Sequence, residues 1–270
     1  MPASRKNVIK KAVDALMTVL LLCLMAYQVT GETLHEWGGI AMTVLLVVHH
    51  VLNFRWYKSL FKGKYNAYRI VTVAVNTLLL ASIALTALCG MAMSSHAVPF
   101  LYGMFPVSFA RRFHLAMSFW SFILMGLHLG LHIPAMTAGF RWNGKIKAAV
   151  AAVFTVVSGV GFRLFIKNGI PDYIFFRTPF AFFDYDKAAA LVFVENLAIL
   201  IAFAFTGAEI ALLIKACGSK SGNGKAKKLI PVCLVLLSLL ICAALTICAG
   251  GGTLPDDVSK WLEANGVKRK

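Results

Sequence analysis

The chain has 270 residues, of which 59% are hydrophobic and 14% are charged, and its mean hydropathy is +0.76. A soluble domain would carry about a quarter charged residues, so this composition excludes an ordinary water-soluble protein and indicates one that lipid surrounds. The formal net charge of +16 would suggest a nucleic-acid partner in a soluble protein, but here Lys and Arg lie between apolar segments, as membrane topology requires, and no nucleic-acid partner is expected.

Seven apolar segments are long enough to cross a bilayer, for which a helix needs about 20 residues. In chain order they cover residues 12–30, 36–54, 70–91, 113–134, 147–166, 188–214 and 229–249. No Ala-x-Ala-like cleavage site follows the first segment, so it is expected to remain as a span. The sequence therefore predicts an all-α, polytopic transmembrane helical bundle of about seven spans over residues 1–250. A short extracytoplasmic amphipathic tail is expected over residues 251–270.

The distribution of basic residues predicts the orientation of this bundle. The larger share of the Lys and Arg residues falls in segments 1–11, 55–69, 135–147 and 215–228. Basic loops stay in the cytoplasm, which places the N-terminus inside and the C-terminus outside. We expect a multi-pass protein of the bacterial cytoplasmic (inner) membrane, in contact with membrane lipid.

Six of the seven histidines fall in only two of the predicted spans, the second and the fourth. Ionisable residues inside a membrane are costly and usually mark functional sites. His35 and His49 are 14 residues apart, and so are His114 and His128. Fourteen helical residues put both members of a pair on one face, about 21 Å apart along the axis. Each of the two spans thus carries one histidine near each side of the bilayer.

The two spans run in the same direction because one span separates them. His35 and His114 are then expected near the outer surface, and His49 and His128 near the cytoplasm. Each pair could hold one iron porphyrin between two imidazoles. The sequence contains no Cys-x-x-Cys-His motif for covalent attachment. The spacing therefore predicts two non-covalent b-type haems stacked across the membrane.

The inner ligands have alternatives. His132 lies one helical turn beyond His128 and could replace it as a ligand or contact a haem propionate. His50 points about 100° away from His49, so it is expected to support the site or to face a quinone, which stays open as a further cofactor. His96 is expected to lie exposed in an outer loop.

Other residues around the histidines are expected to accommodate the haems. Glycines would leave room for a porphyrin face, and arginines at the helix ends could pair with propionates or only anchor the helices at the interface. These residues are Gly38, Gly39, Gly126, Gly130, Arg55, Arg111 and Arg112. Glu195, on the sixth predicted span, could take a proton from a quinol, although an acid near a helix end is common.

The main alternative function is a histidine-lined path for a metal ion or protons. Such paths usually place Asp or Glu beside the histidines, and neither span has an acid beyond Glu36 at its outer end. Interhelical hydrogen bonding would explain one or two histidines, but not the repeated spacing.

Three segments carry a resemblance to a known family: LHEWGGIAMTVLLVVHHVLNFRWY (34–57), FHLAMSFWSFILMGLHLGLH (113–132) and IPDYIFFRTPFAFFDYD (170–186). They resemble the flavinylation-associated membrane cytochromes over roughly residues 10–250. Cytochrome b of quinol oxidoreductases and ferric-reductase-like proteins share the histidine spacing alone. The resemblance implies a di-haem cytochrome that passes electrons from the quinol pool to an extracytosolic protein carrying covalent FMN. Its ligands would be His35, His49, His114 and His128, and the doubled His49–His50 departs from a single inner histidine.

Whether the chain is itself an enzyme stays open, and an electron-transfer subunit of a membrane oxidoreductase is expected.

Segment 170–186 combines seven aromatic residues with Asp172, Asp184 and Asp186. An aromatic patch rimmed by charge suits a transient docking surface for a redox partner. The alternative for this segment is an interfacial aromatic belt that faces lipid.

Overall fold

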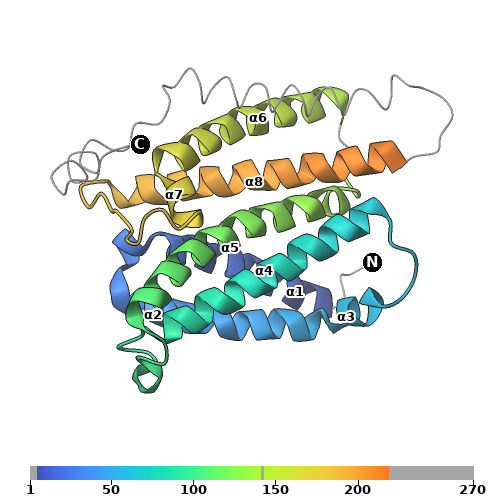
Figure 1. The fold of residues 1–270 in the computed structure, drawn as a ribbon. Helices are drawn as coiled ribbons and strands as arrows, with labels where there is room; N and C mark the ends of the chain where they lie inside the picture. The colour runs from blue at the N-terminus through green and yellow to red at the C-terminus, as the bar shows by residue number, and fades with distance from the viewer. Residues whose placement is uncertain (1–4, 141–142, 219–270) are drawn as a thin grey trace.

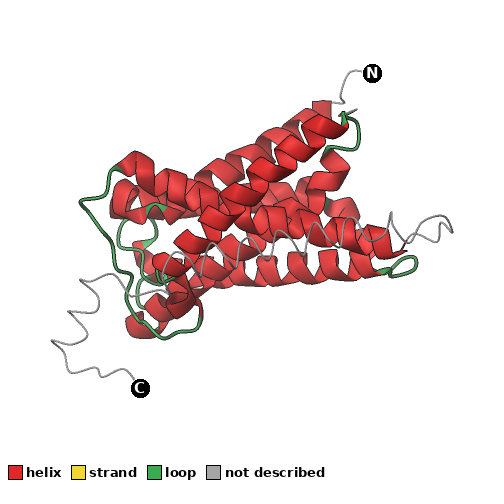
Figure 2. Ribbon diagram, turned by 90° about the horizontal axis from the view of Figure 1, so that it is seen from above, coloured by secondary structure: helices red, strands yellow, loops and turns green. Residues whose placement is uncertain are grey.

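The computed structural model describes residues 5–140 and 143–218, and these residues form helices and loops without a strand (Figure 2). The elements are α1 (Arg5–Met25), α2 (Tyr27–Leu52), α3 (Phe54–Leu60), α4 (Ala67–Met91), the short 3-10 helix η1 (Pro99–Leu101), α5 (Val107–Met136), α6 (Gly144–Lys167), α7 (Ile170–Ile174) and α8 (Ala189–Gly218). The predicted all-helical fold class is confirmed.

Four of the described helices, α4, α5, α6 and α8, are long and apolar enough to cross a membrane, and α2 with α3 adds a fifth if this pair, bent by 59°, forms one span. The first predicted span corresponds to α1, which does not qualify because Lys10, Lys11 and Asp14 make its first half polar. The seventh predicted span, the loop from residue 219 onward and the amphipathic tail lie outside the described residues. Seven spans are therefore not confirmed.

The long helices lie side by side, with α5 packed between α4 and α8 and with α6 on the far side of α8 (Figure 1). The core between them contains Phe122, Leu131 and Ile199, which are almost completely buried. Helix α1 packs mainly against α2, and this pair makes much sparser backbone contacts with the rest of the bundle. Side chains, the histidines among them, therefore lie between α2 and α5.

Glycines allow α5 and α6 each to approach α8 closely. A Cβ atom at Gly126 would lie 2.6 Å from the Cβ of Phe203, and one at Gly130 would overlap the carbonyl of Ala204, both on α8. Gly161 on α6 faces the carbonyl of Ala198 in the same way. Small residues at these positions are typical of membrane helix interfaces.

The prediction that Gly126 and Gly130 leave room for a porphyrin is therefore wrong, because both face α8. Gly38 also lies against a helix, since a Cβ there would be 3.2 Å from the side chain of Leu24 on α1. Of the four glycines, Gly39 alone has open space at its Cβ position.

The bundle has two ends, which we name by their short helices. Helix α7 and the loop between α4 and α5 lie at one end, and α3 lies at the other (Figure 1). Helices α2 and α5 both run from the α7 end to the α3 end. His35 and His114 are consequently near the α7 end, and the other histidines of these two helices are near the α3 end.

Candidate metal centres at the two ends of the bundle

At the α7 end, the structure brings His35 of α2 together with His114 of α5. Their ring centroids are 5.9 Å apart, with an angle of 76° between the ring planes. An imidazole–metal–imidazole arrangement with metal–nitrogen bonds of about 2 Å places two ring centroids about 6 Å apart. The separation of these rings thus fits one iron atom between them.

The tautomer of His114 is set by helix α4. Nδ1 of His114 donates a hydrogen bond to the carbonyl oxygen of Thr86 over 2.9 Å. This bond keeps the proton on Nδ1 and leaves the lone pair of Nε2 for a metal, which is the usual arrangement of a ligating histidine. Nδ1 of His35 is buried without a hydrogen-bond partner among the described residues, although the backbone of Leu24 on α1 also acts on this ring.

Gly90 of α4 lies directly behind the ring of His114. A Cβ atom at Gly90 would be 3.0 Å from Cε1 and 3.1 Å from Nδ1 of that ring. The backbone of α4 can approach the imidazole this closely only because Gly90 has no side chain. Gly90 and Thr86 together hold the ring of His114 between α4 and the interior.

At the α3 end, four histidines of α2 and α5 gather. His49 and His50 both lie within electrostatic range of His128, and the rings of His128 and His132 are 4.8 Å apart between centroids. Nδ1 of His128 lies 2.8 Å from Oδ1 of Asn76 on α4. Because that oxygen can only accept, Nε2 of His128 keeps its lone pair free for a metal.

The hydrogen bond to Asn76 distinguishes His128 from His132. Among the described residues no partner holds the ring nitrogens of His132, whereas Asn76 orients His128. A ligating histidine almost always donates its second nitrogen to a neighbour, which favours His128 as the ligand. His132 lies beside it, where it could contact a haem edge.

The two adjacent histidines of α2 have different partners. Nδ1 of His49 lies 2.8 Å from Oδ1 of Asp14 on α1. Nδ1 of His50 lies 2.7 Å from the hydroxyl of Tyr57 on α3, and Nε2 of His50 is buried without a partner within the described part of the chain. Both residues therefore keep Nε2 available, and both are candidates for the inner ligand from α2.

Asp14 and Asn76 are functional candidates that sequence reasoning missed. The two histidine-bearing spans contain no acid beside the inner histidines, as the sequence indicates, but Asp14 of a third helix, 35 residues from His49 in sequence, lies beside His49. The sequence does mark Asp14 and Asn76 as unusual, because each is a polar residue within an apolar segment. The sequence does not indicate which histidine each of them contacts.

The predicted propionate partners lie at the ends of the bundle. Arg111 lies over the ring of Phe180, 5.9 Å from its centroid. Arg112 lines a hollow of about 400 Å³ together with Ser108, Phe109, Phe113 and Phe176. Arg55 is exposed on α3 at the other end. All three are at the predicted ends, and their pairing with propionates stays a prediction.

The segment after α7 covers the His35–His114 pair. The ring of Phe183 stacks on Tyr27 at 5.4 Å, and Tyr27 packs edge-on against His35 at 5.1 Å. The side-chain amide of Gln28 donates to the carbonyl oxygen of Asp184 over 3.1 Å. This segment therefore acts as a cap that is tied to the start of α2.

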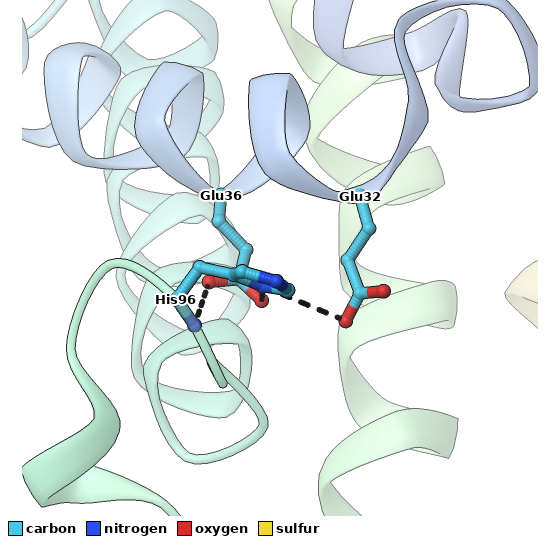
Figure 3. A group of neighbouring side chains, drawn as sticks. All are labelled: Glu32, Glu36 and His96. Atoms are coloured by element: carbon cyan, nitrogen blue, oxygen red, sulfur yellow. Dashed lines mark hydrogen bonds and ion pairs between the residues drawn. The ribbon is translucent and has the colours of Figure 1, made fainter.

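Glu32 and Glu36 of α2 lie close to His96 of the loop after α4 (Figure 3). The carboxylate of Glu36 accepts hydrogen bonds from the backbone N–H groups of Ser95, His96 and Ala97 at 3.1, 2.8 and 2.9 Å. Its oxygens are thus used to hold the loop after α4 against α2, one residue from His35. His96 is exposed in the loop after α4, as predicted, and its Nδ1 lies 3.4 Å from Oε1 of Glu36.

Glu195 is paired with Lys187 and Asn168. Its Oε2 accepts hydrogen bonds from Nζ of Lys187 over 2.7 Å and from Nδ2 of Asn168 over 3.2 Å. This ion pair joins the start of α8 to the segment after α7, so a proton-accepting role for Glu195 has no support in its contacts.

Comparison with known proteins adds no relative: no protein-family model, curated protein or solved structure matches the chain. The resemblance to flavinylation-associated cytochromes therefore depends on the three quoted segments, and the function rests on the site itself.

Proposed function

We propose that the protein is a multi-pass membrane cytochrome that carries electrons across the bilayer through two non-covalent b-type haems. The observation that carries this proposal is the pairing of histidines from α2 and α5 at both ends of the bundle. The rings of His35 and His114 contact each other at one end, and His49 and His50 lie within electrostatic range of His128 at the other. Two such pairs on parallel helices, about 21 Å apart, match two stacked haems.

The orientation of the rings supports this proposal. His114 and His128 each place the proton on Nδ1 by donating to an acceptor on α4, Thr86 and Asn76. Haem, when bound, supplies a one-electron carrier whose potential depends on its axial ligands and their hydrogen bonds. The residues of this chain would supply the ligands, fix their orientation and exclude water from the sites.

The donor would be the quinol pool and the acceptor an extracytosolic protein carrying FMN. The cap over the His35–His114 pair is the proposed exit, because it exposes aromatic side chains beside acids. Phe175 is 58% and Tyr185 is 73% exposed, and Asp184 and Asp186 are also exposed. Apolar contact area with charge for steering is typical of transient redox interfaces.

A reduced-minus-oxidised visible spectrum and a pyridine haemochrome assay of the purified protein test the proposal. We expect a b-type spectrum and two haems per chain. One haem per chain, or none, in protein purified from cells with sufficient haem would contradict it.

A second candidate function is supported by one observation at the α3 end. The carboxylate of Asp14 is 2.8 Å from His49, and an acid beside histidines is what a membrane path for protons or a metal ion requires. This candidate predicts no haem absorbance. It also predicts proton or divalent-metal flux into vesicles that contain the protein, and loss of that flux in Asp14→Asn.

A further inference from the structure

We propose that Asp14 is a positioning residue that lowers the reduction potential of the α3-end haem below that of the α7-end haem. This inference rests on the proposed function and takes His49, the histidine in contact with Asp14, as the α3-end ligand from α2. It goes beyond that function by assigning an unequal pair of potentials and hence a direction of electron transfer.

The first step is the contact between Asp14 and His49. Oδ1 of Asp14 is 2.8 Å from Nδ1 of His49, with the two side chains 49% and 24% exposed. Lys10, one helical turn before Asp14, donates its Nζ to Oδ1 of Asn53 over 2.9 Å and so does not pair with this carboxylate. Within the described residues, His49 is the one side chain paired with Asp14.

The second step is the contrast with the other three candidate ligands. His114 donates to a carbonyl oxygen and His128 donates to an amide oxygen, both of which are neutral acceptors. His35 has no partner for its buried Nδ1 among the described residues. A charged acceptor for a candidate ligand is thus found at the α3 end and not at the α7 end.

The third step is the chemistry of a histidine bound to a carboxylate. A carboxylate that accepts from the second ring nitrogen makes the ligating nitrogen more basic and fixes its orientation. A more basic ligand donates more electron density and stabilises ferric over ferrous iron, which lowers the reduction potential. Electrons would then move downhill from the α3 end to the α7 end, beneath the proposed docking surface.

The test is a spectroelectrochemical titration of the full-length protein and of Asp14→Asn. This substitution keeps the shape and one acceptor oxygen but removes the charge. We expect the lower-potential haem to shift upward by at least a tenfold change in its reduction equilibrium, which is 59 mV for one electron. The other haem should not move, and Asp14→Glu should restore the low potential.

Two further variants make the result specific. Glu32→Gln removes a carboxylate near the opposite end of α2 and should leave the α3-end haem unchanged. Asn76→Asp adds a carboxylate beside His128 and should lower the same haem further. The haems are assigned by His114→Ala, which should remove the α7-end signal.

An unchanged potential of the α3-end haem in Asp14→Asn, with two haems bound, would overturn the inference and leave the proposed function intact. A shift confined to the haem that His114→Ala removes would also overturn it. Absence of haem from the unmodified protein would refute the proposed function itself.

Discussion

Each candidate ligand for which the structure shows a partner is oriented by a residue on another helix. Helix α4 orients two of the three histidines of α5, through Thr86 for His114 and Asn76 for His128. Helix α1 orients His49 of α2 through Asp14. Substitutions at these few residues should therefore change haem binding or potential without changing the fold.

His128→Ala should remove the α3-end haem, whereas His132→Ala should leave it bound. The physical reason is that Asn76 holds Nδ1 of His128 at 2.8 Å, which presents Nε2 for the iron. Haem content and the visible spectrum of the two variants measure this difference. Loss of the haem in His132→Ala with retention in His128→Ala would place the ligand one turn further along α5.

Gly90→Ala should weaken or abolish haem binding at the α7 end. The new Cβ would lie 3.0 Å from Cε1 of His114, so the ring or α4 must move, at a cost of about 1–3 kcal/mol. The measurement is haem stoichiometry together with thermal stability in detergent. Gly144→Ala is the control, since nothing lies within 4 Å of its Cβ position, and an equal effect of both substitutions would contradict the prediction.

At the level of helices, the bundle consists of a tight part and a looser part. Helices α5, α6 and α8 approach one another through glycines, whereas the α1–α2 pair meets the others mainly through side chains. Helix α2 also changes direction near its start, where Gly31 has φ of 71°. A glycine tolerates this left-handed conformation at little cost. Close packing with α8 would hold α5 rigidly in place, and the histidines of α2 lie against those of α5.

Gly130→Ala should destabilise the fold by about 1–3 kcal/mol, because the added Cβ would overlap the carbonyl of Ala204 and separate α5 from α8. The protein that remains folded should keep both haems, since Gly130 faces α8 and not the histidines. Thermal unfolding in detergent and haem content per folded chain are the two measurements. Gly39→Ala serves as the stability control, and a haem defect in Gly130→Ala without loss of stability would contradict this assignment.

In the whole molecule, successive long helices run in opposite directions, so the loops that join them lie alternately at the α3 end and at the α7 end (Figure 1). The loop between α3 and α4, with Lys62 and Lys64, lies at the α3 end, and so does the start of α6, with Lys145 and Lys147 (Figure 1). The loop between α4 and α5 lies at the α7 end with α7 itself (Figure 1). Basic loops are retained in the cytoplasm, which supports the α3 end as the cytoplasmic end.

Cysteine labelling or reporter fusions should therefore place segment 61–66 and segment 215–228 in the cytoplasm. Segment 92–106 and the C-terminus should be outside. The reason is the excess of Lys and Arg in the segments at the α3 end. A cytoplasmic C-terminus would show that the chain crosses the membrane an even number of times, and that the prediction of seven spans is wrong.

Asp184→Asn together with Asp186→Asn should slow electron transfer to a soluble extracytosolic flavoprotein and weaken its dependence on ionic strength. Both acids are exposed on the cap, and such charges mainly steer encounter with a partner. Stopped-flow reduction at several salt concentrations measures both effects. Asp172→Asn is the control, because Asp172 already has Arg177 as its partner at 3.4 Å. Unchanged rates with both haems present would favour the lipid-facing belt.

The sequence by itself determined that the protein is all-helical and which residues are candidate ligands. Both depend on local properties: apolar runs long enough to span a bilayer and a 14-residue repeat of histidines along a helix. Tertiary structure alone decided what each helix face meets. Asp14 beside His49, Asn76 beside His128, and Gly130 against α8 result from the rotation of each helix about its axis. That rotation is set by packing with helices distant in sequence, so no pattern within one helix specifies it.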